Sequence, residues 1–216
     1  MTGRLDPATV DLVGVLAYGE LTAFERIASD AQLAPAVSDK IALASMAATE
    51  FAHFRQLAEH LEEHGVDPVD AMTPFVEALD RFHDSTQPND WYEGLIKAYV
   101  GDGLATDFYR EVSAYVPEEQ TRLLIQAVLA DTGQASFAVA RVKEAIASDP
   151  SLGGRLALWG RRLVGEALIQ AQQVAVDHDA MLALLVGSGD LVGIARLFSR
   201  LTDAHTERMR SLGLSA

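Results

Sequence analysis

The sequence predicts an all-α protein, because its apolar residues recur at helical spacing along almost the whole chain. No stretch sustains the period-two alternation of a half-buried strand, and no Asn-Gly or Asp-Gly pair joins two such stretches. The periodicity predicts six long helices, near residues 8–30, 38–64, 90–115, 118–147, 150–176 and 190–212, with a short one near 75–82.

Capping residues mark where several of these helices should begin. Asp6 and Asp149 each precede a proline, which places a side-chain acceptor at the N-cap and proline at the first helical position. Ser38 is expected to cap the second long helix. Asp90, followed three residues later by Glu93, resembles a capping box for the third.

The lengths of the connections predict how the helices are arranged. Residues 31–37 and the Val116-Pro117 break are short, so helices one and two, and helices three and four, should form antiparallel hairpins. Residues 65–89 can return the chain along a helix of about 40 Å. This is the connectivity of a ferritin-like four-helix bundle, which we expect over residues 1–147 of a single domain that spans 1–216. Residues 148–216 should add two C-terminal helices.

The composition excludes several classes of site. The chain of 216 residues contains no cysteine, which excludes disulfide scaffolds, thiolate zinc sites and iron–sulfur clusters. Any metal must therefore bind carboxylate, imidazole or amide groups. The amino terminus lacks the pattern of a signal peptide and no apolar run is long enough to cross a membrane, so we expect a cytoplasmic protein.

The chain is acidic, with 17 Lys and Arg residues against 31 Asp and Glu residues and a formal net charge of −14. This charge disfavours nucleic acid and favours a small-molecule or protein partner, and an apolar helix face would suit a homodimer. Residues 1–149 carry a net charge of −15 and residues 150–216 a net charge of +1. Any polyanionic partner would therefore have to approach the C-terminal third, where these arginines lie: Arg155, Arg161, Arg162, Arg196, Arg200, Arg208 and Arg210.

Polar side chains interrupt the apolar stripes of the first four helices near the middle of each helix. The residues concerned are Glu20, Glu50, His53, Asp102, Asp131 and Gln134. The two glutamates of the first hairpin are 30 residues apart and the two aspartates of the second are 29 apart, which indicates a weak internal repeat. We therefore expect all six side chains at one height in the bundle core.

Four carboxylates in one core are costly unless cations or protons neutralise them, so a bound metal pair is predicted. Ferritin-like di-iron and di-manganese sites use one Glu from each of two helices and a Glu-x-x-His from each of the other two. The i, i+3 spacing puts carboxylate and imidazole on one helix face. The first hairpin matches this pattern in residue type and spacing. The second matches in spacing only, because its aspartates are shorter and an amide is a weaker ligand for iron than imidazole.

Metal-free interpretations remain open for the same residues. Glu20, Glu50 and His53 could form a buried carboxylate–histidine network with a charged imidazole. The aspartates of the second hairpin could be satisfied by tyrosine hydroxyls or arginines. His60 and His64 have i, i+4 spacing, but they lie near a helix end among glutamates, where charge complementarity explains them better than metal binding does.

Over its whole length the chain resembles the actinobacterial ferritin-like proteins grouped with the tRNA 2-methylthio-isopentenyladenosine hydroxylase. Residues 20–26, 50–57, 101–110 and 204–209 carry the resemblance. It implies a non-haem di-iron centre that activates dioxygen to hydroxylate an allylic carbon of a modified tRNA base. It also implies six metal positions, of which the last three depart from the family's residue types: Glu20, Glu50, His53, Asp102, Asp131 and Gln134.

Two hypotheses of different classes follow. In the first, the chain is a di-metal hydroxylase with a substrate cavity beside the metals. In the second, the fold is retained around a vestigial site, and the chain is a metal-free helical scaffold or interaction protein.

Overall fold

The computed structural model describes residues 4–130, 134–177 and 191–216, and within these ranges the regular structure is helical. The elements are α1 (Pro7–Asp30), η1 (Ala31–Leu33), α2 (Val37–Glu63), α3 (Pro68–Met72), η2 (Thr73–Phe75), α4 (Val76–Ser85), α5 (Trp91–Ser113), α6 (Glu119–Val128), α7 (Gln134–Ser148), α8 (Leu152–Asp177) and α10 (Leu191–Ser211). The all-α prediction is confirmed. None of the helices in these ranges is long and apolar enough to cross a membrane.

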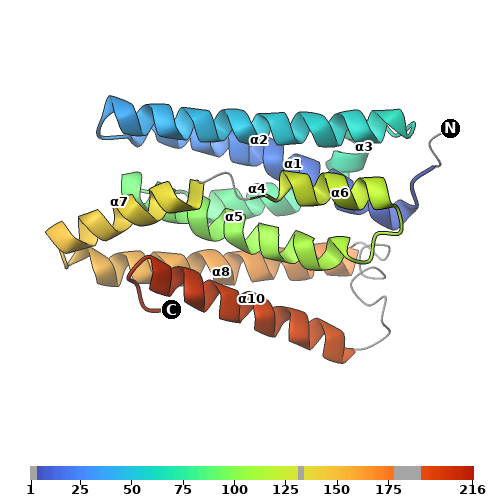
Figure 1. Cartoon of the computed structure of the whole chain (residues 1–216). Coiled ribbons are helices and arrows are strands. Elements are labelled where there is room, and N and C mark those ends of the chain that lie inside the picture. The colour runs from blue at the N-terminus through green and yellow to red at the C-terminus, as the bar shows by residue number, and fades with distance from the viewer. Residues whose placement is uncertain (1–3, 131–133, 178–190) are drawn as a thin grey trace.

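The helices form an elongated bundle (Figure 1). The pair α1 and α2 runs antiparallel along one side, α5 with α6 and α7 crosses the middle, and α8 and α10 lie along the opposite side. The segment from α3 to α4 returns the chain between the two hairpins and contacts both α1 and α8. The predicted long crossover with its short helix is therefore confirmed.

Two of the predicted caps form and two do not. Asp6 accepts a hydrogen bond from the Thr9 amide, and Asp90 accepts from the amides at the start of α5. The Ser38 prediction is wrong, because Ser38 lies inside α2 and the N-cap residue is Ala36. Asp149 accepts from the Ser151 amide at 3.0 Å in a turn, and α8 begins only at Leu152.

The predicted continuous helix over 118–147 is wrong, because α6 ends at Val128 and α7 begins at Gln134. The intervening sequence contains Asp131-Thr132-Gly133, and all three residue types have low helix propensity. Nothing in the apolar periodicity signalled this interruption. The second hairpin therefore does not reproduce the pair of unbroken helices that form the first.

The two larger of the three apolar clusters in the described core lie at different heights of the bundle. One contains Leu16, Leu57 and Tyr109, and the other contains Ile27 and Val100 with their neighbours. On α1 and α2 the residues between these clusters include the predicted polar positions. Hydrophobic packing thus stabilises the helices on both sides of a polar level.

The tight approach of α1 to α3 gives a stability prediction. A Cβ at Gly14 would overlap the carbonyl oxygen of Ala71, so Gly14→Ala should lower the free energy of unfolding by about 1–3 kcal/mol. Gly165→Ala on α8 is the matched control, since no atom lies within 4 Å of its added Cβ. The control should be neutral or stabilising by up to about 1 kcal/mol in urea denaturation. Equal effects at the two sites would contradict the close α1–α3 packing.

Candidate metal centre and adjoining cavity

The first hairpin brings Glu20, Glu50 and His53 together. One ligand atom from each side chain can be chosen so that all three lie within 4.8 Å of one another. The His53 Nδ1 lies 3.4 Å from Glu20 Oε2 and 3.8 Å from Glu50 Oε2. Glu20 on α1 is 8% exposed and Glu50 on α2 is 5% exposed, so both carboxylates lie in the core as the sequence predicts.

Burial of the two carboxylates is unfavourable for their charged forms, and the neighbouring imidazole offsets part of this desolvation. Burial raises the pKa of Glu20 well above its usual range, His53 opposes the rise and Glu50 adds to it. The same two carboxylates, Glu20 first, raise the pKa of His53 to about 10. The Glu20 Oε2 atom has no hydrogen-bond partner within the described residues. An imidazolium therefore holds the two glutamates in the metal-free chain.

The second hairpin does not complete this group within the described residues. Asp102 lies on α5, is exposed and lines the cavity described below, but it is not one of the three clustered ligands. Asp131 lies outside the described residues, and so does the side chain of Gln134, the first residue of α7. These three ligand assignments remain predictions.

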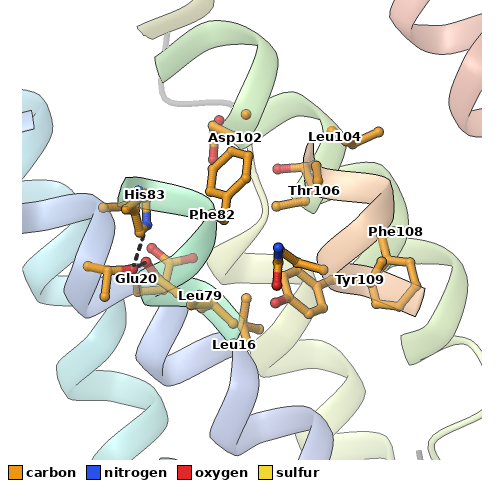
Figure 2. Close-up of a pocket in the computed structure, with 18 of the residues that line it drawn as sticks. Leu16, Glu20, Leu79, Phe82, His83, Asp102, Leu104, Thr106, Phe108 and Tyr109 are labelled. Atoms are coloured by element: carbon orange, nitrogen blue, oxygen red, sulfur yellow. Dashed lines mark hydrogen bonds between the residues drawn. The ribbon is translucent and has the colours of Figure 1, made fainter. Parts of the chain in front are cut away.

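A cavity of about 260 Å³ adjoins the three clustered side chains. Its walls come mainly from α1, α4, α5 and α8, with Glu20 and Glu50 among them. Figure 2 shows Leu79 and Phe82 of α4 on one side and Phe108 and Tyr109 of α5 on the other. Glu20 and Glu50 thus face a largely apolar space inside the bundle.

Four polar residues that the sequence reasoning did not select also line this cavity: Arg26, Asp30, His83 and Lys97. Lys97 is 6% exposed, and its Nζ donates to the Thr86 carbonyl oxygen at 2.8 Å. Burial lowers the pKa of Lys97 to about 8, Asp30 opposes that shift and Arg26 adds to it. In the sequence, Lys97 lies between Leu95 and Val100 on the apolar side of a helix, and this position could have indicated a buried polar group.

Most of the C-terminal arginines are engaged within the chain. Arg155 pairs with Asp90 and Glu93, and further carboxylates or carbonyl oxygens accept from five others: Arg161, Arg162, Arg200, Arg208 and Arg210. An arginine that already neutralises a carboxylate contributes less to binding a polyanion. The basic C-terminal third therefore offers a weaker nucleic-acid surface than its composition indicates.

A family model of a ferritin-like domain of actinomycetes matches residues 3–188. The chain belongs to this family. The match includes both hairpins, the crossover and α8, and hence every residue of the candidate metal centre, whereas α10 lies beyond it. The comparison with curated proteins gives no match. Membership establishes the fold of this ferritin-like protein, whereas its substrate depends on the residues of the site.

The buried His83 of this ferritin-like protein gives a pH prediction. Burial, then Lys97 and Arg26, lower the pKa of His83 to about 3, so folding favours the neutral ring. The unfolded chain binds a proton below about pH 6.5, so the folded state should lose about 1–2 kcal/mol from this residue between pH 7 and pH 5. Urea denaturation of His83→Gln should show a shallower decline than wild type over that range. Parallel declines would contradict the assignment of a neutral buried imidazole.

Proposed function

We propose that this ferritin-like protein binds a divalent metal, iron foremost, and uses it to oxidise a small, largely apolar molecule held in the adjoining cavity. The observation that carries the proposal is the cluster of Glu20, Glu50 and His53, of which the two glutamates line a cavity whose other walls are mostly apolar. Two carboxylates and an imidazole form a ligand set suited to non-haem iron. The three side chains come from adjacent helices of one hairpin, which holds them in fixed register.

The arrangement of these side chains without a metal leaves a position that a cation would stabilise. The buried Glu20 Oε2 lies 3.4 Å from the His53 Nδ1 without forming a hydrogen bond, so it is an acceptor that a cation can satisfy. The two carboxylates repel each other, and a divalent ion removes that repulsion more completely than one imidazolium does. Binding requires His53 to release its proton, so the ion replaces the proton as the positive charge between the glutamates.

When bound, the metal supplies dioxygen activation, and the chain supplies the surroundings. Leu16, Leu79 and Phe82 line the space beside the ligands and give it an apolar surface. Tyr109 is buried on the same wall, and burial together with the charge of Glu20 raises its pKa, so its hydroxyl stays protonated. Apolar side chains and a neutral tyrosine thus make up the lining nearest the metal ligands, and the charged residues Arg26, Asp30 and Lys97 line another part of the cavity.

A hydroxylase with a di-iron centre is the fuller form of this proposal, with Asp102, Asp131 and Gln134 as the remaining ligands. Within it, we favour a small molecule over a tRNA base. The net charge of −14 and the internally paired arginines both oppose a polyanion.

The second candidate function is a metal-free scaffold, and one observation favours it. His53, with a pKa raised to about 10, forms with Glu20 and Glu50 the charged network that a vestigial site would retain. Such a chain would act through its surface, as an interaction protein.

In either form, we propose that two copies pair through α2. Five apolar residues are exposed along one stripe of this helix, and the steps between them alternate between four and three residues. They are Val37, Ile41, Ala44, Ala48 and Phe51. A two-fold axis near Ala44 would place Val37 of one copy opposite Phe51 of the other, which leaves small residues at the crossing. The stripe is therefore complementary to itself in an antiparallel pair.

Metal content tests the proposed function directly. Protein expressed with iron and purified without chelator or nickel should carry about one metal ion per chain from the three clustered ligands, and about two if the second hairpin contributes. Glu50→Ala should lose it, because the site is left with one carboxylate. Glu59→Gln on the exposed side of α2 is the matched control and should keep it. Mass spectrometry that finds less than about 0.1 metal per chain in wild type would refute the metalloenzyme and support the scaffold.

The oligomeric state tests the α2 interface. Ile41→Glu should convert a dimer to a monomer in light scattering, because it buries two like charges beside the two-fold axis. Leu158→Glu on α8 is the matched control, since Leu158 is 64% exposed and Ile41 is 61% exposed. A wild-type monomer, or a dimer that only Leu158→Glu disrupts, would contradict this interface.

A further inference from the structure

The polar group of Arg26, Asp30, His83 and Lys97 lies between two hollows. All four residues line the apolar cavity beside the candidate metal ligands, and all four also line a neighbouring hollow of about 330 Å³. Of the other five residues that line the second hollow, three are polar: Ser29, Gln32 and Gln87. The group thus forms the boundary between a polar hollow and the apolar cavity.

The group carries unsatisfied hydrogen-bonding capacity. The Arg26 Nε and the His83 Nδ1 are buried and have no hydrogen-bond partner within the described residues, while the other His83 nitrogen lies 3.2 Å from Thr22 Oγ1. A charged donor without an acceptor is expensive to bury. An anionic oxygen at this position would supply the missing acceptor.

The charge balance of the group also favours an anion. Arg26 and Lys97 are cationic, Asp30 supplies one carboxylate, and His83 is neutral at ordinary pH. Asp84, near Lys97, is exposed to solvent and its charge is more strongly screened. These half-buried and buried side chains therefore carry one surplus positive charge in a chain whose net charge is −14.

We propose that the cavity binds an amphipathic organic anion, with its acidic head between Arg26 and Lys97 and its apolar body extending toward Glu20. The cavity volume of about 260 Å³ is near the lower end of the range for small-molecule sites, about 300–1,000 Å³, and suits a short chain or compact ring system. The inference rests on the proposed function in making this ligand the substrate of the metal centre. The binding itself needs no metal.

The arrangement also assigns which part of the ligand reacts. Arg26 follows Glu20 by six residues on α1, which is about 9 Å along the helix axis. A ligand anchored by its head at Arg26 presents a carbon several bonds away to the metal ligands. Oxidation should therefore fall on the apolar body, remote from the acidic group.

The test compares decanoate with decanol, which share a chain and differ in charge, by calorimetric titration of the full chain with and without iron. Decanoate should bind at least about tenfold more tightly than decanol, a difference of about 1.4 kcal/mol. Arg26→Gln and Lys97→Met should each weaken decanoate about tenfold and leave decanol within about twofold. Equal binding of the two probes, or equal loss of both in these variants, would overturn the proposal.

Blocking the cavity provides a second arm that does not remove a charge. Gly101 lines the cavity and has no atom within 4 Å of an added Cβ, so Gly101→Leu fills the space while favouring the helix. It should abolish decanoate binding, whereas Gly165→Leu on α8, equally unobstructed and outside the cavity lining, should not. Undiminished binding in Gly101→Leu would place the anion elsewhere and overturn the proposal.

Metal analysis of the same samples separates this inference from the proposed function. Glu50→Ala, which removes a metal ligand, should still bind decanoate, because the anchoring residues are intact. Charge-selective binding of decanoate in a chain without metal would support the ligand class and refute the metalloenzyme. A metal-loaded chain that does not distinguish the probes would refute the ligand class alone.

Discussion

The burial of two carboxylates between two apolar clusters is the constraint on which the rest of this structure depends. Glu20 and Glu50 lie where the helical stripe calls for apolar side chains, and each carries a desolvation cost that packing does not repay. A positive charge at the same level offsets that cost, and His53 supplies one in the metal-free chain. The clusters above and below then provide the stability that allows this polar level to persist.

The cavity follows from the same constraint. Side chains that would otherwise fill the space beside Glu20 are short on α5, where Gly101 and Ala105 line the wall. The second polar group, around Lys97, repeats the arrangement with charges of both signs and a surplus of positive charge. The two groups separate charge along α1, with carboxylates near Glu20 and cations near Arg26. A ligand with one acidic end would match that polarity.

The two hairpins are unequal in a way that matters for function. α1 and α2 are unbroken, so their polar residues keep fixed positions relative to each other. The second hairpin is interrupted after Val128, where Leu129 and Ala130 lie outside α6. A weak sequence repeat therefore produced two hairpins of similar course, of which only the first brings its predicted ligands together within the described residues. This asymmetry gives the three-residue cluster of Glu20, Glu50 and His53 the central role in any chemistry here.

The sequence by itself determined the helical class, the hairpin and crossover connectivity, the absence of thiolate chemistry, and the inward position of Glu20 and Glu50. These follow from local rules, because apolar spacing and i, i+3 geometry act within one helix or between chain neighbours. Only the tertiary structure decided that α6 and α7 are separate and that Arg26, Asp30, His83 and Lys97 meet. Those four residues come from α1, α4 and α5, and no periodicity within one helix encodes which side chains of distant helices will share a cavity. Their meeting depends on how the crossover packs between the hairpins, which is a property of the whole bundle.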